Sequence, residues 1–383
     1  MKQAVVIGAG IGGLASSIRL ASKGYQVTVF EANPYPGGKL SAFSIEGYRF
    51  DAGPSLFTMP QYVNELFECV GEDPKYYFDY KKKTVGCHYF WSDHTRFKAF
   101  SDREEFLNEI ENRFQEPRDK VAQYLARAKK KYDLTHQLFL EHSLHRLKTY
   151  LSVKTIKALA NLGVFELPKT LHQANAAAFS SPHLIQLFDR YATYNGSDPF
   201  QTSGIMTLIQ HLEGHFGTYI PIKGMESITL SLFELAKKIG VTFKFNSRVT
   251  EILEQHSKVT GVKLDTDIKP ADLVVSNMDI YPTFKNLLPN AQPPTKILNQ
   301  ERSSSAVIFY WGIKQSFEDL ELHNIFFSDD YKAEFKAIFQ DHTVSDDPTI
   351  YINITSKDIP EDAPEGCENW FVMINTPADY GQD

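Results

Sequence analysis

The stretch AVVIGAGIGGLASSIRLASKG occupies residues 4–24 and decides how the chain begins to fold. Residues 4–7 are a short apolar run typical of a buried strand, and glycines follow at once. The helical pattern after them ends near Gly24, and residues 26–30 (QVTVF) predict a second strand that ends at Glu31. Strand, helix and strand in this order predict a βαβ unit in a parallel sheet.

The glycines of this stretch have the spacing G-x-G-x-x-G. Gly8 allows the tight turn from strand to helix, Gly10 lets a pyrophosphate approach the backbone, and Gly13 lets the helix pack closely on the strand. The N–H groups at the helix start then face the phosphates, which the helix dipole favours. We therefore expect a dinucleotide to bind along the whole turn, at Gly8, Ala9, Gly10, Ile11, Gly12 and Gly13.

The residues after the second strand favour FAD over NAD as the dinucleotide. Glu31 is placed to accept hydrogen bonds from ribose hydroxyls, with Ala32 beside it. In the following PGGKLS, residues 36–41, a second glycine pair allows close backbone approach and a cation can neutralise phosphate. No second G-x-G-x-x-G occurs in the sequence, so we expect one dinucleotide. The expected contacts in this second segment are Gly37, Gly38, Lys39 and Leu40.

The composition is that of a globular protein. The chain has 383 residues, of which 42% are hydrophobic and 23% charged, which is enough for two or three domains. The three cysteines lie far apart and no Cys/His cluster has metal-ligand spacing. We therefore expect reduced thiols, no metal site and a cytoplasmic location. No stretch approaches the roughly 20 apolar residues that a membrane span requires.

Charge is distributed unevenly along the chain. The net charge is −7, yet residues 118–157 carry about +7, which leaves about −14 for the remainder. Such asymmetry indicates either a surface that meets anionic lipid or nucleic acid, or a solvated helix face. The basic residues of this segment are Arg118, Lys120, Arg127, Lys129, Lys130, Lys131, Arg146, Lys148, Lys154 and Lys157.

The order of predicted elements indicates a domain built from non-contiguous pieces. Residues 103–165 are mostly helical in pattern, and sheet signals return only after residue 215. A helix is expected over 224–238. Strands are expected over 241–245, 249–254, 273–276, 307–310, 349–354 and 370–374.

Several blocks resemble a known superfamily. Glu31 followed by GGKLS resembles the second dinucleotide signature of the flavin amine oxidases and phytoene desaturases, which have Arg where this chain has Lys39. FDAGPSLFTMP, residues 50–60, is similar to the next block of that superfamily. The later blocks follow in order and together resemble bacterial carotenoid desaturases of the phytoene desaturase type. They are YATYNGSDPF from Tyr191, YIPIKGMESI from Tyr219, NSRVTEI from Asn246, ADLVVSNMD from Ala271 and NIFFSDDYKAEF from Asn324.

The resemblance implies an α/β fold, in which a Rossmann-like FAD-binding domain of the glutathione-reductase type is interrupted by a helix-rich α+β substrate domain. The FAD domain is expected over residues 1–100 and 216–282, a helix-rich substrate and membrane-facing region over 101–215, and a substrate-domain sheet over 283–383. Relatives close with a glycine-rich segment that completes the flavin site. This chain reaches Asp383 without one, so we expect a shortened chain.

The resemblance also implies roles for individual residues. The backbone of Gly53, Pro54 and Ser55 is expected to approach the flavin ring, and Val249 to pair its backbone with adenine. Flavin supplies the difficult chemistry in such enzymes, so a strong protein catalyst is not required and no catalytic residue is assigned. Asp51, beside the flavin-approaching loop, is a candidate for positioning or proton handling; its other interpretation is a capping role.

The expected activity is FAD-dependent desaturation of a carotenoid, either phytoene or a later carotene or hydroxycarotenoid intermediate. A flavin amine oxidase and a non-catalytic lipid-binding escort protein of the same fold remain alternatives. The expected partners are an apolar carotenoid substrate and membrane lipid at the surface, without nucleic acid. The protein is accordingly expected to be cytoplasmic and peripherally membrane-associated.

Overall fold

The computed structural model describes residues 1–136, 162–379 and 381. The chain forms two compact units, and each is made of three separate stretches. The first unit comprises Met1–Lys81, Tyr219–Glu301 and Asp358–Glu365. The second unit comprises Lys82–Thr218, Arg302–Lys357 and Gly366–Asp383.

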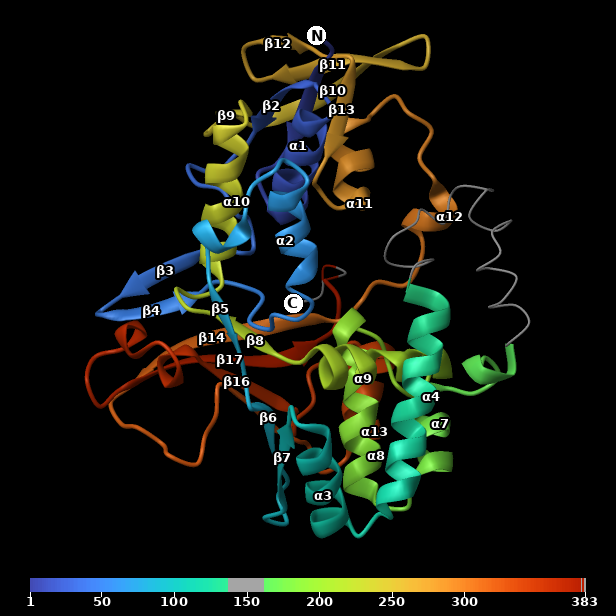
Figure 1. Ribbon diagram of the computed structural model, residues 1–383. Helices are drawn as coiled ribbons and strands as arrows, with labels where there is room; N and C mark the ends of the chain where they lie inside the picture. The colour runs from blue at the N-terminus through green and yellow to red at the C-terminus, as the bar shows by residue number, and fades with distance from the viewer. Residues whose placement is uncertain (137–161, 380, 382–383) are drawn as a thin grey trace. The chain divides into compact units, whose positions relative to one another are not determined.

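The first unit is organised around a four-stranded parallel sheet with strand order β13-β1-β2-β9. Successive side chains along each strand point to opposite faces of the sheet. Val6 and Val29 therefore point to one face, and Val5 and Thr28 to the other. Helices α1 and α10 cover the first of these faces (Figure 1). The bounds are β1 Gln3–Ile7, α1 Ile11–Ser22, β2 Gln26–Phe30, α10 Glu226–Lys238, β9 Thr242–Lys244 and β13 Leu273–Ser276.

An antiparallel meander, β10-β11-β12, packs on the opposite face of the parallel sheet. Val249, Ile252 and Val262 of the meander form a buried cluster with Val5 and Ile7 of β1. The remaining elements of the unit include a hairpin, β3-β4, and short helices. Their bounds are β3 Ala42–Ile45, β4 Tyr48–Asp51, α2 Gln61–Glu68, β10 Val249–Gln255, β11 Lys258–Leu264, β12 Ile268–Pro270, α11 Ile280–Pro282 and α12 Thr295–Leu298.

The second unit combines a six-stranded mixed sheet, of order β14-β17-β16-β15-β6-β7, with helices. An aromatic-rich core joins the β6–β7 part of the sheet to α3, α4 and α8 (Figure 1). The strands are β6 Val85–Phe90, β7 Arg96–Phe100, β14 Ser305–Ile313, β15 His323–Phe326, β16 Ile350–Ile354 and β17 Glu368–Thr376. The helices are α3 Arg103–Phe114, α4 Arg118–His136, α7 Leu171–Ala178, α8 Pro182–Asp189, α9 Ile209–His211 and α13 Tyr331–Lys336. Strand β5 (Tyr80–Lys82) pairs with β8 (Tyr219–Pro221) in a separate two-stranded sheet.

This architecture confirms the expected fold class, an interrupted α/β domain with a helix-rich α+β partner. The unit boundaries differ from the expected ones. The first unit ends at Lys81 rather than near residue 100, because β6 and β7 pair with each other and β6 pairs with β15. The first unit also includes the short stretch Asp358–Glu365, which no sequence pattern indicated.

Part of the basic segment 118–157 is engaged within the second unit. Residues 137–161 lie outside the described part of the chain, which includes Arg146, Lys148, Lys154 and Lys157. Four of the six described basic residues are ion-paired, namely Arg118 with Glu104, Lys120 with Glu116, Lys129 with Asp133 and Lys131 with Glu166.

Lys131 is a structural residue rather than a surface charge. Its side chain is 1% exposed, and its ammonium group donates to Glu166 Oε2 at 2.6 Å, Thr207 Oγ1 at 2.6 Å and the Gly204 carbonyl at 3.1 Å. Burial lowers the pKa of Lys131, and the neighbouring Glu166 carboxylate opposes that change. Charge counting along the sequence could not separate this buried lysine from its exposed neighbours.

Replacing Lys131 with Ala should lower the free energy of unfolding by about 3–5 kcal/mol, because it leaves three polar partners without their shared donor. Urea unfolding followed by circular dichroism measures the change. Lys130→Ala is the matched control, since Lys130 is exposed on the same helix and its loss should change stability by no more than about 0.5 kcal/mol. Equal effects of the two substitutions would contradict a structural role for Lys131.

Candidate functional site

The turn between β1 and α1 is closed by a direct contact between two glycines. Gly8 has φ of +92°, and its N–H donates to the Phe30 carbonyl at 2.8 Å. A Cβ on Gly13 would lie 2.0 Å from the Gly8 carbonyl oxygen, which no side chain can do. Glycine at position 13 therefore lets the first turn of α1 lie directly against the end of β1.

The first turn of α1 offers unused hydrogen-bond donors. The N-cap residue is Gly10, which has no side chain to cap the helix, and the turn contains no acidic residue. Leu14 is the first residue whose N–H reaches an acceptor in the helix, the Gly10 carbonyl at 2.9 Å. The N–H groups of the preceding positions point out of the helix start, where the dipole favours an anion. This end of α1 fits a phosphate.

The second glycine pair lies on the first glycine loop. The Gly37 N–H donates to the Ala9 carbonyl at 2.8 Å, and Gly10 and Gly37 form an isolated bridge. On the other side, Thr229 of α10 donates through Oγ1 to the Leu40 carbonyl at 2.7 Å. The two segments that the sequence singled out are thus brought together and attached to α10.

Glu31 is buried beside the same loop. Its Oε2 accepts the Ala9 N–H at 2.7 Å, and its Oε1 accepts the Asn33 N–H at 2.8 Å. A carboxylate has about four acceptor positions, so two remain for the hydroxyls of a ribose. Glu31 therefore ties the end of β2 to the glycine loop and keeps acceptor capacity for a ligand.

The block at residues 50–60 packs against the second glycine segment. A Cβ on Gly53 would lie 2.0 Å from the Lys39 carbonyl oxygen, and the Ala52 N–H donates to the Ser41 carbonyl at 2.8 Å. These contacts place the stretch of Gly53, Pro54 and Ser55 next to residues 37–41. The two segments are therefore close enough to contact the same ligand. Contact of this stretch with the flavin ring stays a prediction.

Asp51 is buried, and it caps the N-terminus of α10. It accepts Arg49 Nη2 at 2.8 Å, the Met225 N–H at 3.1 Å and the Glu226 N–H at 3.4 Å. The last two are the N-terminal donors of α10. These contacts fit the capping interpretation of Asp51, and a part in positioning or proton handling stays a prediction.

Val249, the first residue of β10, lies two residues after Ser247, whose N–H donates to the Glu31 carbonyl at 2.8 Å. The expected adenine partner is therefore attached to the end of β2 through a short stretch of backbone. Its pairing with adenine stays a prediction.

Asn277 is a neighbour of the glycine loop that the sequence did not single out. It follows β13 directly, and its amide lies over the glycine loop. The quoted block ADLVVSNMD contained it, and the general rule that ligands bind at the carboxyl ends of parallel strands could have identified it.

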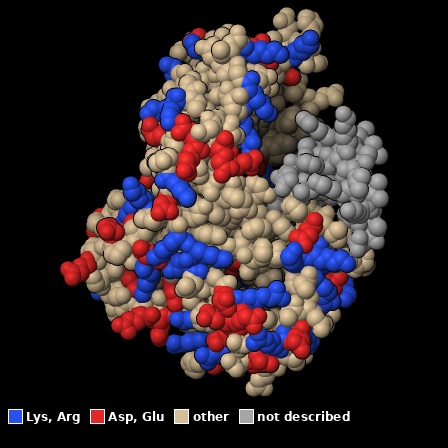
Figure 2. Space-filling model, viewed as in Figure 1, with Lys and Arg blue, Asp and Glu red and all other residues tan. Residues whose placement is uncertain are grey.

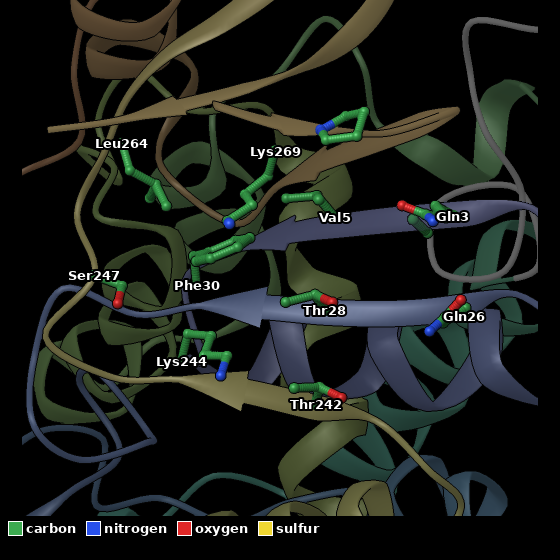
Figure 3. Close-up of a pocket in the computed structure, with 12 residues that line it drawn as sticks. Gln3, Val5, Gln26, Thr28, Phe30, Thr242, Lys244, Ser247, Leu264 and Lys269 are labelled. Carbon is green, nitrogen blue, oxygen red and sulfur yellow. The ribbon is translucent and has the colours of Figure 1, made fainter. Parts of the chain in front are cut away.

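A cavity of about 360 Å³ lies in the same unit, on the face of the parallel sheet opposite α1 and α10 (Figure 3). Phe30, Lys244 and Ser247 line it at the carboxyl ends of β2 and β9, and Gln3 and Gln26 at the opposite ends of their strands. None of the glycine-loop residues lines this cavity. This cavity is therefore separate from the predicted dinucleotide site at the glycine loop.

Comparison with known proteins agrees with this geometry. A family model described as flavin containing amine oxidoreductase matches residues 11–352. The chain is 54% identical over 383 residues to a 1-hydroxycarotenoid 3,4-desaturase of Flavobacterium sp. (strain P99-3), covering all of this chain and 78% of that protein. It is 31% identical to a 4,4'-diapolycopene oxygenase of Methylomonas sp, covering 98% and 76%.

Among solved structures, an oxidoreductase from Methanosarcina mazei has a similar fold, with a TM-score of 0.63 and 16% identity, covering 99% of this chain and 79% of that one. The match to flavin-containing proteins confirms FAD as the expected dinucleotide.

Replacing Glu31 with Gln should weaken FAD binding by roughly ten- to a hundredfold, since charged hydrogen bonds contribute about 1.5–3 kcal/mol. The amide would also present an N–H group to one of the two backbone donors that the carboxylate now accepts. Quenching of flavin fluorescence during titration of flavin-free protein measures the dissociation constant. Glu254→Gln, at an exposed position of β10, is the matched control and should bind FAD normally.

Proposed function

The chain belongs to the flavin containing amine oxidoreductase family, and on that premise we propose that it is an FAD-dependent enzyme that desaturates a hydroxylated carotenoid. The observation that carries the proposal is 54% identity to a hydroxycarotenoid desaturase over the full length of the chain. The glycines and the acid that the cofactor requires are all present, and they lie together at one end of a parallel sheet.

The chain's own part in this reaction is to bind and orient. Bound FAD supplies the oxidising chemistry, which removes two hydrogens from adjacent carbons of the substrate. The α1 N-terminus and the segment at Gly37 and Gly38 hold the phosphates, Glu31 holds a ribose, and Val249 contacts adenine. Asp51 attaches the end of β4 to the N-terminus of α10, so that the following segment from Gly53 to Ser55 starts from a defined position.

The activity is tested with the purified, FAD-loaded protein and a 1-hydroxycarotenoid dispersed in detergent. We expect a product that has lost two hydrogens by mass and absorbs at longer wavelength, because one more double bond is conjugated. Gly10→Val is the control, since a side chain at position 10 would enter the phosphate groove and abolish FAD binding. An FAD-loaded protein that leaves every hydroxycarotenoid unchanged would contradict the proposal.

Peripheral contact with a membrane is a further part of the proposal. A carotenoid has no water-soluble pool, so an enzyme that takes it up gains from docking on a bilayer. Within the described ranges, no helix is both long and apolar enough to cross a membrane. On the face seen in Figure 2, basic and acidic side chains are interspersed, and the described part of this face presents no purely basic surface.

Arg127 and Lys130 are exposed on α4 and belong to the basic segment. Reversing both to Glu should weaken binding to anionic vesicles by roughly thirtyfold or more, since each lost basic residue removes about 1 kcal/mol and each new carboxylate is repelled. Vesicle co-sedimentation at low and moderate salt measures this, because screening shortens the field to about 8 Å at physiological ionic strength.

The matched control reverses Lys258 and Lys263, which are exposed on the meander, and should leave vesicle binding unchanged. If the unaltered protein bound neutral and anionic vesicles equally well, the membrane proposal would be contradicted. The basic residues of α4 would then form a solvated helix face.

A further inference from the structure

Asn277 has a fixed backbone position at the mouth of the dinucleotide site. Its N–H donates to the Ile7 carbonyl at 2.9 Å, which continues the parallel ladder in which Ile7 faces Ser276. Ile7 is the last residue of β1 before the glycine loop. The main chain of Asn277 is therefore attached to the same strand end from which the loop departs.

The side-chain amide of Asn277 lies over the glycines of that loop. A Cβ on Gly10 would lie 2.7 Å from Asn277 Nδ2, and a Cβ on Gly12 would lie 2.5 Å from Asn277 Oδ1. A Cβ on Gly13 would lie 3.3 Å from the same Nδ2. Only a run of residues without side chains leaves room for the amide in this place.

The amide also has hydrogen-bonding capacity to offer. Asn277 is exposed, and its side chain makes no hydrogen bond to any residue in the described part of the chain. An amide NH₂ carries two donors, and phosphate oxygens are acceptors. The neighbouring donors at the start of α1 come from the backbone, so a side-chain donor above them would complete the enclosure of an anion.

We infer that Asn277 binds the dinucleotide, donating a hydrogen bond from its side-chain amide to a phosphate oxygen. The inference rests on the proposed FAD site and adds to it a residue from the strand β13. It also gives a second reason for glycine at position 10 and a reason for glycine at position 12, since both positions make room for the amide.

The first test is calorimetric titration of flavin-free protein with FAD and with ADP. Asn277→Ala should weaken both by about tenfold, because both ligands carry the phosphates and hydrogen bonds to charged groups contribute about 1.5–3 kcal/mol. Asn277→Asp should weaken both further, because a carboxylate repels phosphate. Asn290→Asp, at an exposed position of the same unit, is the charge-matched control and should leave both affinities unchanged.

The second test uses the contact between Gly12 and the amide. Gly12→Ala should displace the Asn277 side chain and weaken FAD binding, although Asn277 itself is unchanged. In the Asn277→Ala background, the same Gly12→Ala substitution should have little further effect, since no amide is left to displace. This double-mutant cycle separates an effect through the amide from a direct clash between residue 12 and the ligand.

Three outcomes are distinguishable. If the unaltered protein binds no FAD, the proposed function itself fails. If it binds FAD and Asn277→Ala binds FAD and ADP equally well, the inference is wrong while the function stands. If Gly12→Ala weakens binding equally in both backgrounds, glycine 12 serves the ligand directly, and the inferred coupling through Asn277 is overturned. Circular dichroism of each flavin-free variant establishes that the fold is retained.

Discussion

The close approach of Gly13 to the Gly8 carbonyl is the constraint on which the site depends. Because α1 starts directly against the end of β1, its unpaired N–H groups lie at the carboxyl ends of the parallel strands. Glu31 at the end of β2 and Asn277 at the end of β13 then reach the same loop from two sides. If a side chain at position 13 pushed the helix away from the strand, the N–H groups of α1 would move away from Glu31 and Asn277.

This constraint is local, but the site it organises is not. The loop and Glu31 lie within the first 31 residues, whereas β13 pairs with β1 only after some 260 residues of chain have intervened. Thr229 and the capped end of α10 also come from the later stretch. The second unit is built largely from the chain between these stretches. The dinucleotide site is thus completed only when distant strands pair, which makes it dependent on long-range contacts that form slowly in folding.

The sequence predicted well wherever a local pattern dictates structure. The βαβ opening, the helix that begins near residue 224 and the strand at 273–276 follow from periodicity and glycine spacing, and the structure contains them. It did not predict the strands β6, β7 and β15, because their partners are distant and their side chains do not alternate cleanly: all six residues of β6 are buried. Spacing indicated the parts of the site that lie on one turn. It gave no indication of Asn277, which reaches the glycine loop through a tertiary contact.

Two of the buried carboxylates of the first unit, Glu31 and Asp51, indicate what the chain contributes to its chemistry. Glu31 and Asp51 each accept two backbone N–H groups, so each connects segments that are distant in sequence or structure. A carboxylate occupied in this way holds the backbone segments around it in position. Such an arrangement suits an enzyme whose cofactor performs the oxidation, because the remaining demand on the chain is alignment. The absence of an obvious acid–base pair in the sequence is therefore what this kind of catalysis leads one to expect, and the residues that matter most are those that hold backbone against cofactor.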